Sequence, residues 1–98
     1  MQIEKKGENS VMSIALEGRL DTMTAPQLEA EVQGKLDGVT ELNFDFAKLS
    51  HISSAGLRVL LSAQKLMNRQ GTMKILHVGE VIQEIFEVTG FSDILTIE

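Results

Sequence analysis

The strongest constraint on the fold is the order of two kinds of apolar repeat, which alternate along the chain. In residues 11–17 and 41–46 every second residue is apolar, as in strands that bury one face. Residues 24–36, 54–70 and 81–86 instead repeat apolar residues every three or four positions, as in helices that bury one side. This order predicts an α/β fold whose interior strands are parallel and joined by right-handed crossovers.

Shorter segments complete the expected set of elements. Residues 1–6 and 94–97 predict edge strands, and residues 74–78 predict a short strand. Residues 18–23 and 47–53 are expected to be loops. The third helix should end before Gly90, with four apolar residues facing the core: Val81, Ile82, Ile85 and Phe86.

The ends of the first helix carry local signals. Thr24 is a favoured capping residue, because its hydroxyl can accept a hydrogen bond from an unpaired backbone N–H group. Met23 and Leu28 have the spacing of a hydrophobic staple across the helix start. Asp37-Gly38 is expected to end this helix.

Composition limits the classes of protein that fit the sequence. The 98 residues suffice for one domain, residues 1–98, and the net charge of −5 argues against a nucleic-acid-binding surface. Absence of cysteine excludes disulfides and thiolate zinc sites. No apolar run approaches the length of a membrane span, so we expect a cytoplasmic protein that does not insert into membranes. A monomer is favoured.

The segment that carries most functional information is Ser50–Leu61, where a loop leads into the second helix. Ser53 and Ser54 are adjacent at this junction. Unpaired N–H groups and the helix dipole favour anions there. A phosphate on one of these hydroxyls would bring about −1.5 to −2 charges to a place that tolerates them. We therefore interpret the segment as a candidate switch.

A polar stripe follows the switch along the second helix. At about 100° per residue, one side of this helix carries Arg58, Ser62, Lys65 and Arg69, beginning one turn after Ser54. The stripe is either a solvated face or a docking face that attracts an acidic partner to an acidic protein. The pattern alone leaves both interpretations open.

A catalytic or metal-binding function has less support in the sequence than a switch. A nucleophilic Ser54 needs a base within reach, but the only histidines are His51 and His77, and no Gly-x-Ser-x-Gly motif is present. Asp21, Asp45 and His51 lack the spacing of metal ligands, and no phosphate-binding glycine loop occurs. We expect a protein that is not an enzyme and holds neither metal nor cofactor.

Three segments together resemble the STAS domain, the module of bacterial anti-sigma factor antagonists and of sulfate-transporter tails. They are Gly18-Arg19-Leu20-Asp21, Leu42-Asn43-Phe44-Asp45 and Ile52-Ser53-Ser54-Ala55-Gly56-Leu57. The third is the most specific. The resemblance spans essentially the whole chain and implies a single-domain STAS-like fold, a small mixed sheet with helices packed mainly on one face.

The resemblance also implies the site. Aligning on Gly56-Leu57 puts the phosphoacceptor of the family at Ser54, with Ser53 as the alternative. Ser53 stands where phosphorylated members usually have aspartate, and this departure favours the alternative of a non-phosphorylated member. The implied partner-binding residues are Asp21, Thr22, His51, Ser53, Ser54, Arg58, Ser62 and Lys65.

The function that the resemblance implies is partner switching. The unmodified chain would bind an anti-sigma factor that is also a serine kinase, and phosphorylation would separate the two until a serine phosphatase resets the chain. ATP is then the substrate of the kinase and not a cofactor of this protein. The alternative is a non-phosphorylated STAS subunit, for example in a lipid-transport ATPase complex.

Overall fold

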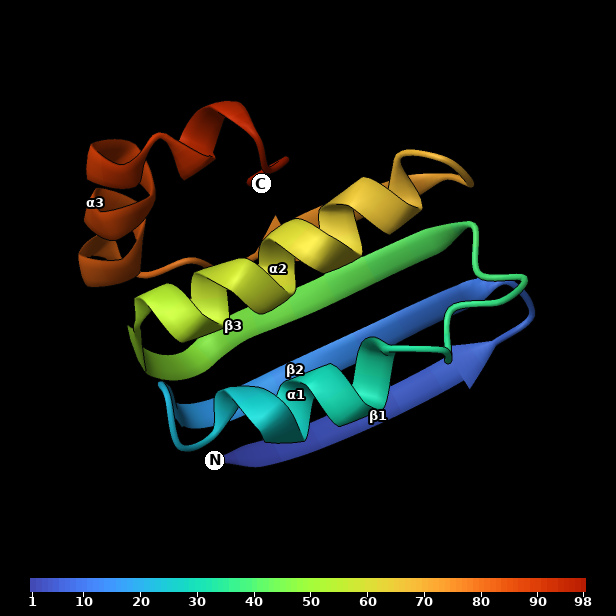
Figure 1. The fold of residues 1–98 in the computed structure, drawn as a ribbon, viewed down its shortest axis with the longest axis horizontal. Coiled ribbons are helices and arrows are strands. Elements are labelled where there is room, and N and C mark those ends of the chain that lie inside the picture. Colours follow the sequence, from blue (N-terminus) through green and yellow to red (C-terminus); the bar gives the residue numbers. More distant parts are fainter.

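The computed structural model describes all 98 residues as four strands, three helices and one 3-10 turn (Figure 1). The strands are β1 (Gln2–Glu8), β2 (Val11–Leu20), β3 (Glu41–Ile52) and β4 (Thr72–Leu76). The helices are α1 (Ala25–Val32), α2 (Ser54–Met67) and α3 (Glu80–Thr89), followed by the turn η1 (Phe91–Asp93). None of the helices combines the length and apolar character that crossing a bilayer requires.

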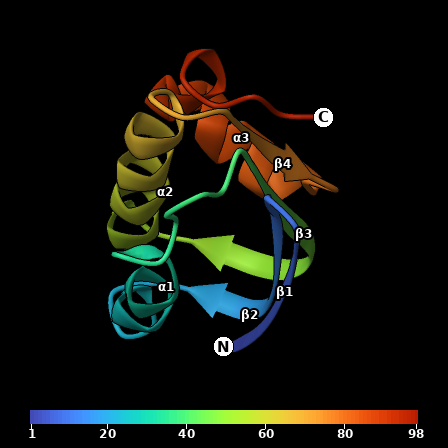
Figure 2. The same cartoon turned by 90° about the vertical axis from the view of Figure 1, so that its right-hand side faces the viewer.

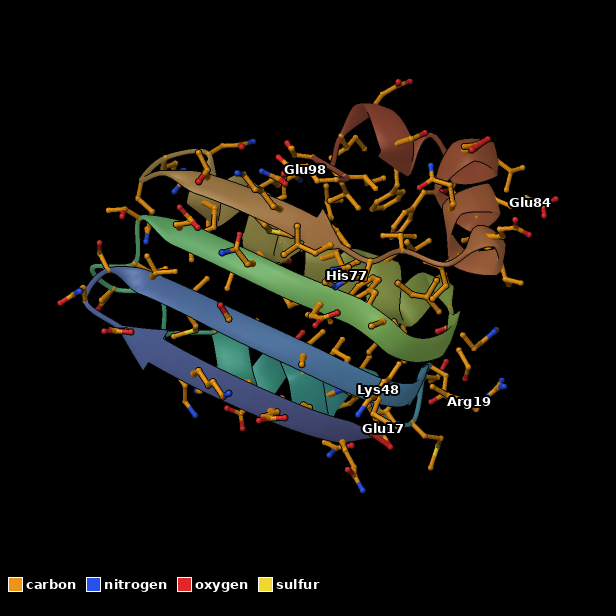
Figure 3. All side chains as sticks on the ribbon, turned by 180° about the vertical axis from the view of Figure 1, so that it is seen from behind. Glu17, Arg19, Lys48, His77, Glu84 and Glu98 are labelled. Carbon is orange, nitrogen blue, oxygen red and sulfur yellow. The ribbon has the colours of Figure 1, made fainter.

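The strands form one mixed sheet in the order β1-β2-β3-β4. β1 pairs antiparallel with β2, whereas β2, β3 and β4 are parallel, as the alternation of strands and helices predicts. Figure 2 shows α1 and α2 on the same side of this sheet. Figure 3, seen from behind, shows strands that no helix covers. The predicted fold class is confirmed.

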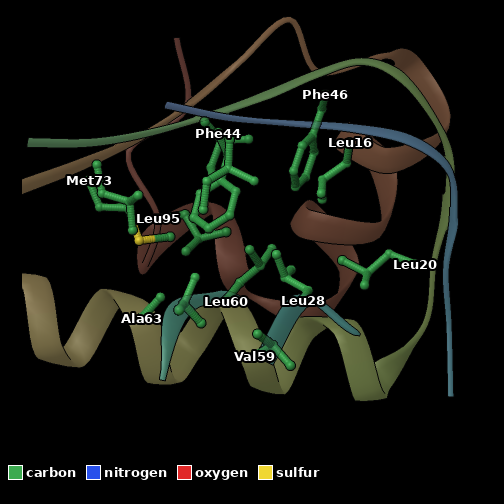
Figure 4. Close-up of a cluster of buried hydrophobic side chains, with 14 of the residues drawn as sticks. Leu16, Leu20, Leu28, Phe44, Phe46, Val59, Leu60, Ala63, Met73 and Leu95 are labelled. Atoms are coloured by element: carbon green, nitrogen blue, oxygen red, sulfur yellow. The ribbon is translucent and has the colours of Figure 1, made fainter. Parts of the chain in front are cut away.

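The core lies between the sheet and the helices and forms one cluster of 23 buried residues. Phe44 and Phe46 on β3 pack against each other with ring centroids 6.2 Å apart (Figure 4). Phe86 on α3 packs against Phe46, with ring centroids 6.4 Å apart. Burying a side chain of this size stabilises the fold by about 1.5–3 kcal/mol. The contact between Phe46 and Phe86 therefore joins α3 to the same core.

The two central strands run further than the sequence predicts. β2 continues to Leu20 and β3 to Ile52, through residues expected to be loops. The register between the strands shifts twice, which is the mark of β-bulges. Each bulge breaks the two-residue alternation, so Leu49 and Ile52 both point into the core at spacings of three. The broken alternation is why the sequence predicts a loop at residues 47–53. In β2 the alternation continues to Leu20, with Gly18 in place of an apolar side chain.

Helix α1 is shorter than the sequence predicts. It ends at Val32, and Asp37-Gly38 lies beyond it in an irregular segment. The backbone is extended at Gln33 and left-handed at Gly34, where φ is 72°, so the helix cannot continue. Leu36 is nevertheless only 2% exposed. Leu36 therefore continues the four-residue spacing of buried residues in α1, although it lies outside the helix.

Three further expectations are corrected at other ends of elements. Val81 is 63% exposed, so the buried face of α3 is formed by Ile82 and Phe86, with Ile85 half-buried. The expected last strand is a single bridge between Ile75 and Ile97. Helix α2 ends at Met67 rather than at residue 70.

Replacement of Gly71 by alanine should destabilise the protein strongly. Gly71 follows the turn after α2, and a Cβ atom there would lie 1.9 Å from the carbonyl oxygen of Thr40. Two backbones would have to separate, which we expect to cost at least about 1–3 kcal/mol in the free energy of unfolding. Urea denaturation followed by circular dichroism measures the loss. Gly79→Ala is the control, because nothing lies within 4 Å of that position. Equal losses in the two variants would contradict the steric argument.

Candidate partner-binding site at the start of α2

The extended pairing of β2 and β3 brings two connections together at one edge of the sheet. Leu20 and Ile52 are paired at the ends of the two strands. The backbone N–H of Ser53 donates a hydrogen bond to the carbonyl oxygen of Leu20, at 2.9 Å. The first turn of α2 then packs closely on β2, since a Cβ at Gly56 would lie 2.6 Å from Cγ of Leu20. The turn after β2 therefore flanks the start of α2.

Asp21 organises the turn after β2. Its Oδ1 accepts hydrogen bonds from the N–H groups of Met23, at 3.0 Å, and Thr24, at 3.1 Å. The Thr24 hydroxyl accepts from the N–H of Asp21 and donates to the carbonyl oxygen of Arg19, at 2.8 Å. Thr24 occupies the cap position as predicted but makes no side-chain capping bond to α1. The hydrophobic staple to Leu28 is wrong, because Met23 is 87% exposed.

The surroundings of Asp21 favour its charged form. Loss of solvent raises the pKa of its carboxyl, but the hydrogen bonds from Thr24 and Met23 and the nearby charge of Arg19 outweigh that effect. The pKa of Asp21 therefore lies below its ordinary value of 3.8. At neutral pH the turn presents a carboxylate that is already bound to its own backbone.

The two serines at the start of α2 differ in environment. Ser54 is the first residue of the helix and its side chain is exposed. Ser53 is the N-cap residue, yet its hydroxyl makes no capping bond, and its Oγ is buried without a hydrogen-bond partner. Ser54 is therefore open to a neighbouring molecule, whereas the hydroxyl of Ser53 faces the protein interior.

The polar stripe of α2 faces solvent along its whole length. Arg58, Ser62, Lys65 and Arg69 are all exposed, as the helical spacing predicts. None of the three cations belongs to an ion pair within the protein, although six such pairs exist elsewhere. These cations are available to an acidic partner.

The structure gathers most, but not all, of the residues predicted for the site. Thr22, Arg58 and Ser62 line one hollow of about 300 Å³ between the turn after β2 and α2. His51 is half-buried on β3, opposite Arg19, and its ring makes no hydrogen bond. Lys65 lies further along α2, outside this hollow.

The sequence interpretation missed other residues at the same place. Met23 projects from the turn, and the hollow is also lined by residues from α1 and α2: Ala25, Pro26, Glu29, Ala55 and Val59. Only a correct alignment of the two helices could have found them. The remaining histidine, His77, hydrogen-bonds to Asp45 at 2.9 Å and lies on the uncovered face of the sheet (Figure 3).

Removing the Ser53 hydroxyl should not weaken the fold. A buried hydroxyl without a partner costs about 1–3 kcal/mol, whereas loss of a working N-cap costs about 0.5–2 kcal/mol. Because Ser53 makes no cap bond, Ser53→Ala should leave the free energy of unfolding unchanged or raise it. Thr24→Ala is the comparison and should lower it by about 1 kcal/mol or more, since that hydroxyl is bonded. Chemical denaturation of both variants decides, and a loss at Ser53 would refute the assignment.

The contribution of Asp21 to stability should depend on pH. Because its pKa is lowered in the folded protein, the carboxylate stabilises the fold fully above its ordinary value of 3.8 and loses that effect as the pH falls through the folded-state pKa. Asp21→Asn should therefore melt below the parent protein at pH 7, and the gap should close below about pH 3.8. Thermal melts across this range test it. A gap that does not change with pH would rule out a role for the charge.

Comparison with known proteins identifies the family. The family model described as the STAS domain matches residues 2–98. BtrV of Bordetella bronchiseptica, which carries a provisional assignment as an anti-sigma factor antagonist, is 35% identical over 91 residues, covering 91% of this chain and 78% of BtrV. The anti-sigma-B factor antagonist of Listeria monocytogenes is 31% identical over 97 residues, covering 96% of this chain and 84% of its own.

Solved structures show the same fold. The anti-sigma factor antagonist SpoIIAA, in its unphosphorylated form, superposes with a TM-score of 0.79 at 19% identity, covering 99% of this chain and 87% of its own. The phosphorylated form of SpoIIAA from Bacillus superposes with a TM-score of 0.78 at the same identity, covering 99% of this chain and 91% of its own. The family match and the sequence relatives, together with this shared fold, establish that the chain belongs to the anti-sigma factor antagonist family of STAS domains.

Proposed function

We propose that this protein binds an anti-sigma factor through the surface around Ser54, and that phosphorylation of Ser54 ends the binding. The observation that carries the proposal is the contrast between two adjacent serines, of which only Ser54 presents its side chain to solvent. Antagonists of this family are regulators without catalytic activity, which agrees with the expectation that the chain is not an enzyme.

The accessibility of Ser54 supports it as the phosphoacceptor over Ser53. A kinase must bring the hydroxyl oxygen into line with the γ-phosphate of ATP, so the oxygen has to be reachable from outside. Ser54 meets this condition at the first position of α2. Oγ of Ser53 is buried, and a phosphate there would have to displace the groups that bury it. Ser53 could act only after local opening.

The proposed contact surface joins the turn after β2 to the stripe on α2. Asp21 fixes the turn, and Thr22 and Met23 project from it beside the start of the helix. Arg58 and Lys65 supply unpaired positive charge on a chain whose net charge is −5. This local charge would attract and orient an acidic region of the anti-sigma factor.

Phosphorylation would separate the complex by electrostatics alone. A dianion at Ser54 would place unpaired negative charge, and the cost of removing its water, inside a packed interface. An unfavourable change of about 3–4 kcal/mol would weaken binding by a few hundred-fold. In the free protein the same phosphate would lie at the N-terminus of α2, where the helix dipole favours it. The domain need not refold.

In the proposed cycle the anti-sigma factor is also the kinase, and ATP is its substrate. A serine phosphatase returns the chain to its binding form. SpoIIAA, a structural relative, has been solved in both phosphorylated and unphosphorylated forms. The proposed setting is the cytoplasm, where sigma factors meet RNA polymerase.

Substitutions at Ser54 should separate binding from release. In pull-downs from the native host, Ser54→Ala should retain the anti-sigma factor, and Ser54→Asp should reduce its recovery at least about tenfold because the carboxylate carries part of the charge of a phosphate. Ser13→Asp, an exposed change on the uncovered face of the sheet, is the matched control and should behave like the parent. Mass spectrometry after incubation with the recovered kinase and ATP should place phosphate on Ser54.

Two outcomes would contradict the proposal. Equal recovery of the anti-sigma factor by Ser54→Ala and Ser54→Asp would show that charge at this position does not control binding. Phosphate on Ser53 alone would refute the argument from exposure. Stable association with a transport ATPase, without any modification, would instead support the subunit role.

A further inference from the structure

The early end of α1 leaves part of α2 without a helical neighbour. α1 ends at Val32, and the irregular residues 33–40 follow it. A second hollow, of about 280 Å³, lies between this segment and α2. It shares Glu29, Val59 and Ser62 with the hollow beside the switch, so the two hollows are neighbours that meet at these residues. We call the combined feature the α1–α2 groove.

The chemistry of the groove differs from floor to walls. Its floor is apolar, formed by Val32, Leu36, Val59, Ala63 and Leu66. Arg58 lines the wall formed by α2, and Lys65 lies one position before Leu66 on the same helix. The wall formed by α1 carries Glu29, and no ion pair joins it to Arg58 across the groove. An apolar channel thus has an unpaired cation on one side and a carboxylate on the other.

We propose that the α1–α2 groove receives apolar side chains of an acidic segment of the anti-sigma factor, whose carboxylates face Arg58 and Lys65. The inference rests on the proposed function and specifies the chemistry of the partner. Charge complementarity selects this occupant, because Arg58 on the α2 wall forms no ion pair within the protein. Lys65 lines neither hollow but is exposed and unpaired further along the same helix. Glu29 orients the docked segment, because the carboxylates of that segment would be repelled from the α1 wall and turn toward α2.

A second copy of the chain is a poorer occupant. A symmetric dimer places the same patch of both subunits face to face, so one groove would lie opposite the other. Both hollows would then stay unfilled, whereas apolar side chains of an acidic segment fill the groove while its carboxylates neutralise Arg58.

The position of the groove links it to the switch. One end is lined by Thr22 and Ala55, and Ala55 directly follows Ser54. Ser54 itself lines neither hollow, but a phosphate on it would lie one residue from this end of the groove and so near an acidic occupant. Repulsion between like charges would then act on the segment whose side chains fill the groove, so modification and docking oppose each other directly.

Filling the groove should weaken binding without harming the fold. Ser62 is exposed and lines both hollows, so Ser62→Trp would place an indole in the groove. By calorimetry with the purified anti-sigma factor recovered in the Ser54 experiment, Ser62→Trp should raise Kd at least about tenfold, and Ser62→Ala by less than about twofold. Val81→Trp is the control for an added indole, because Val81 is exposed on α3. The melting temperatures of all three variants should match the parent.

Charge reversal tests the second half of the inference. Arg58→Glu combined with Lys65→Glu should raise Kd at least about tenfold, whereas Lys6→Glu on β1 should leave it unchanged. Parent-like affinity of Ser62→Trp would overturn the inference and leave the proposed function intact. Parent-like affinity of the charge-reversed protein would overturn the inference together with the role proposed above for the cations of α2, and leave only the switch at Ser54. If no anti-sigma factor binds the parent chain, both fall. Dimers of the parent in light scattering that Ser62→Trp abolishes would assign the groove to a second copy instead.

Discussion

The whole site depends on the parallel pairing of β2 and β3 and on how far it continues. Because the two strands remain paired to Leu20 and Ile52, the segments that leave them start side by side at one edge of the sheet. The hydrogen bond from Ser53 to Leu20 closes that edge, and Gly56 lets the first turn of α2 approach the end of β2. Without this pairing, the Asp21 turn and the start of α2 would have no fixed relation.

The site combines a well-satisfied turn with a poorly satisfied helix start. Asp21 and Thr24 use their side chains to bond the backbone around them, so the turn is held in one shape before any partner arrives. At the N-cap of α2 the hydroxyl of Ser53 is buried without a partner. Such a group stabilises nothing by itself, and exceptions of this kind concentrate at functional positions.

The sequence predicted the parts of the fold that depend on regular periodicity. The alternation in residues 41–46 and the helical repeat after Ser54 gave the sheet, the parallel connections and the exposed stripe of α2. The sequence does not predict the full extent of elements in which a bulge adds a residue or a residue takes a left-handed backbone conformation. The bulges in β3 conceal the last six residues of the strand from the alternating pattern. Gly34 ends α1 before Leu36, which is buried at helical spacing although it lies outside the helix.

The same division applies to the site. Local signals predicted the pair of serines and the stripe on α2, and the resemblance to a family singled out Ser54 and supplied Asp21 and Thr22. The α1–α2 groove could not be predicted, because it forms beside the part of α2 that extends past the end of the shorter helix α1. Burial of the Ser53 hydroxyl likewise depends on the packing of the folded chain and cannot be predicted from the positions of hydroxyl residues in the sequence.

The two bulges make the length of β3 as constrained as its composition. In a strand, neighbouring side chains point to opposite sides, so one residue more or fewer exchanges the sides for everything that follows. The extra residues at the register shifts in β3 therefore determine which way each side chain points where the chain enters α2. A deletion between Asp45 and His51 could keep every serine in the sequence and still turn the wrong one outward. The number of residues in β3, and not only their identity, therefore decides which serine hydroxyl is exposed.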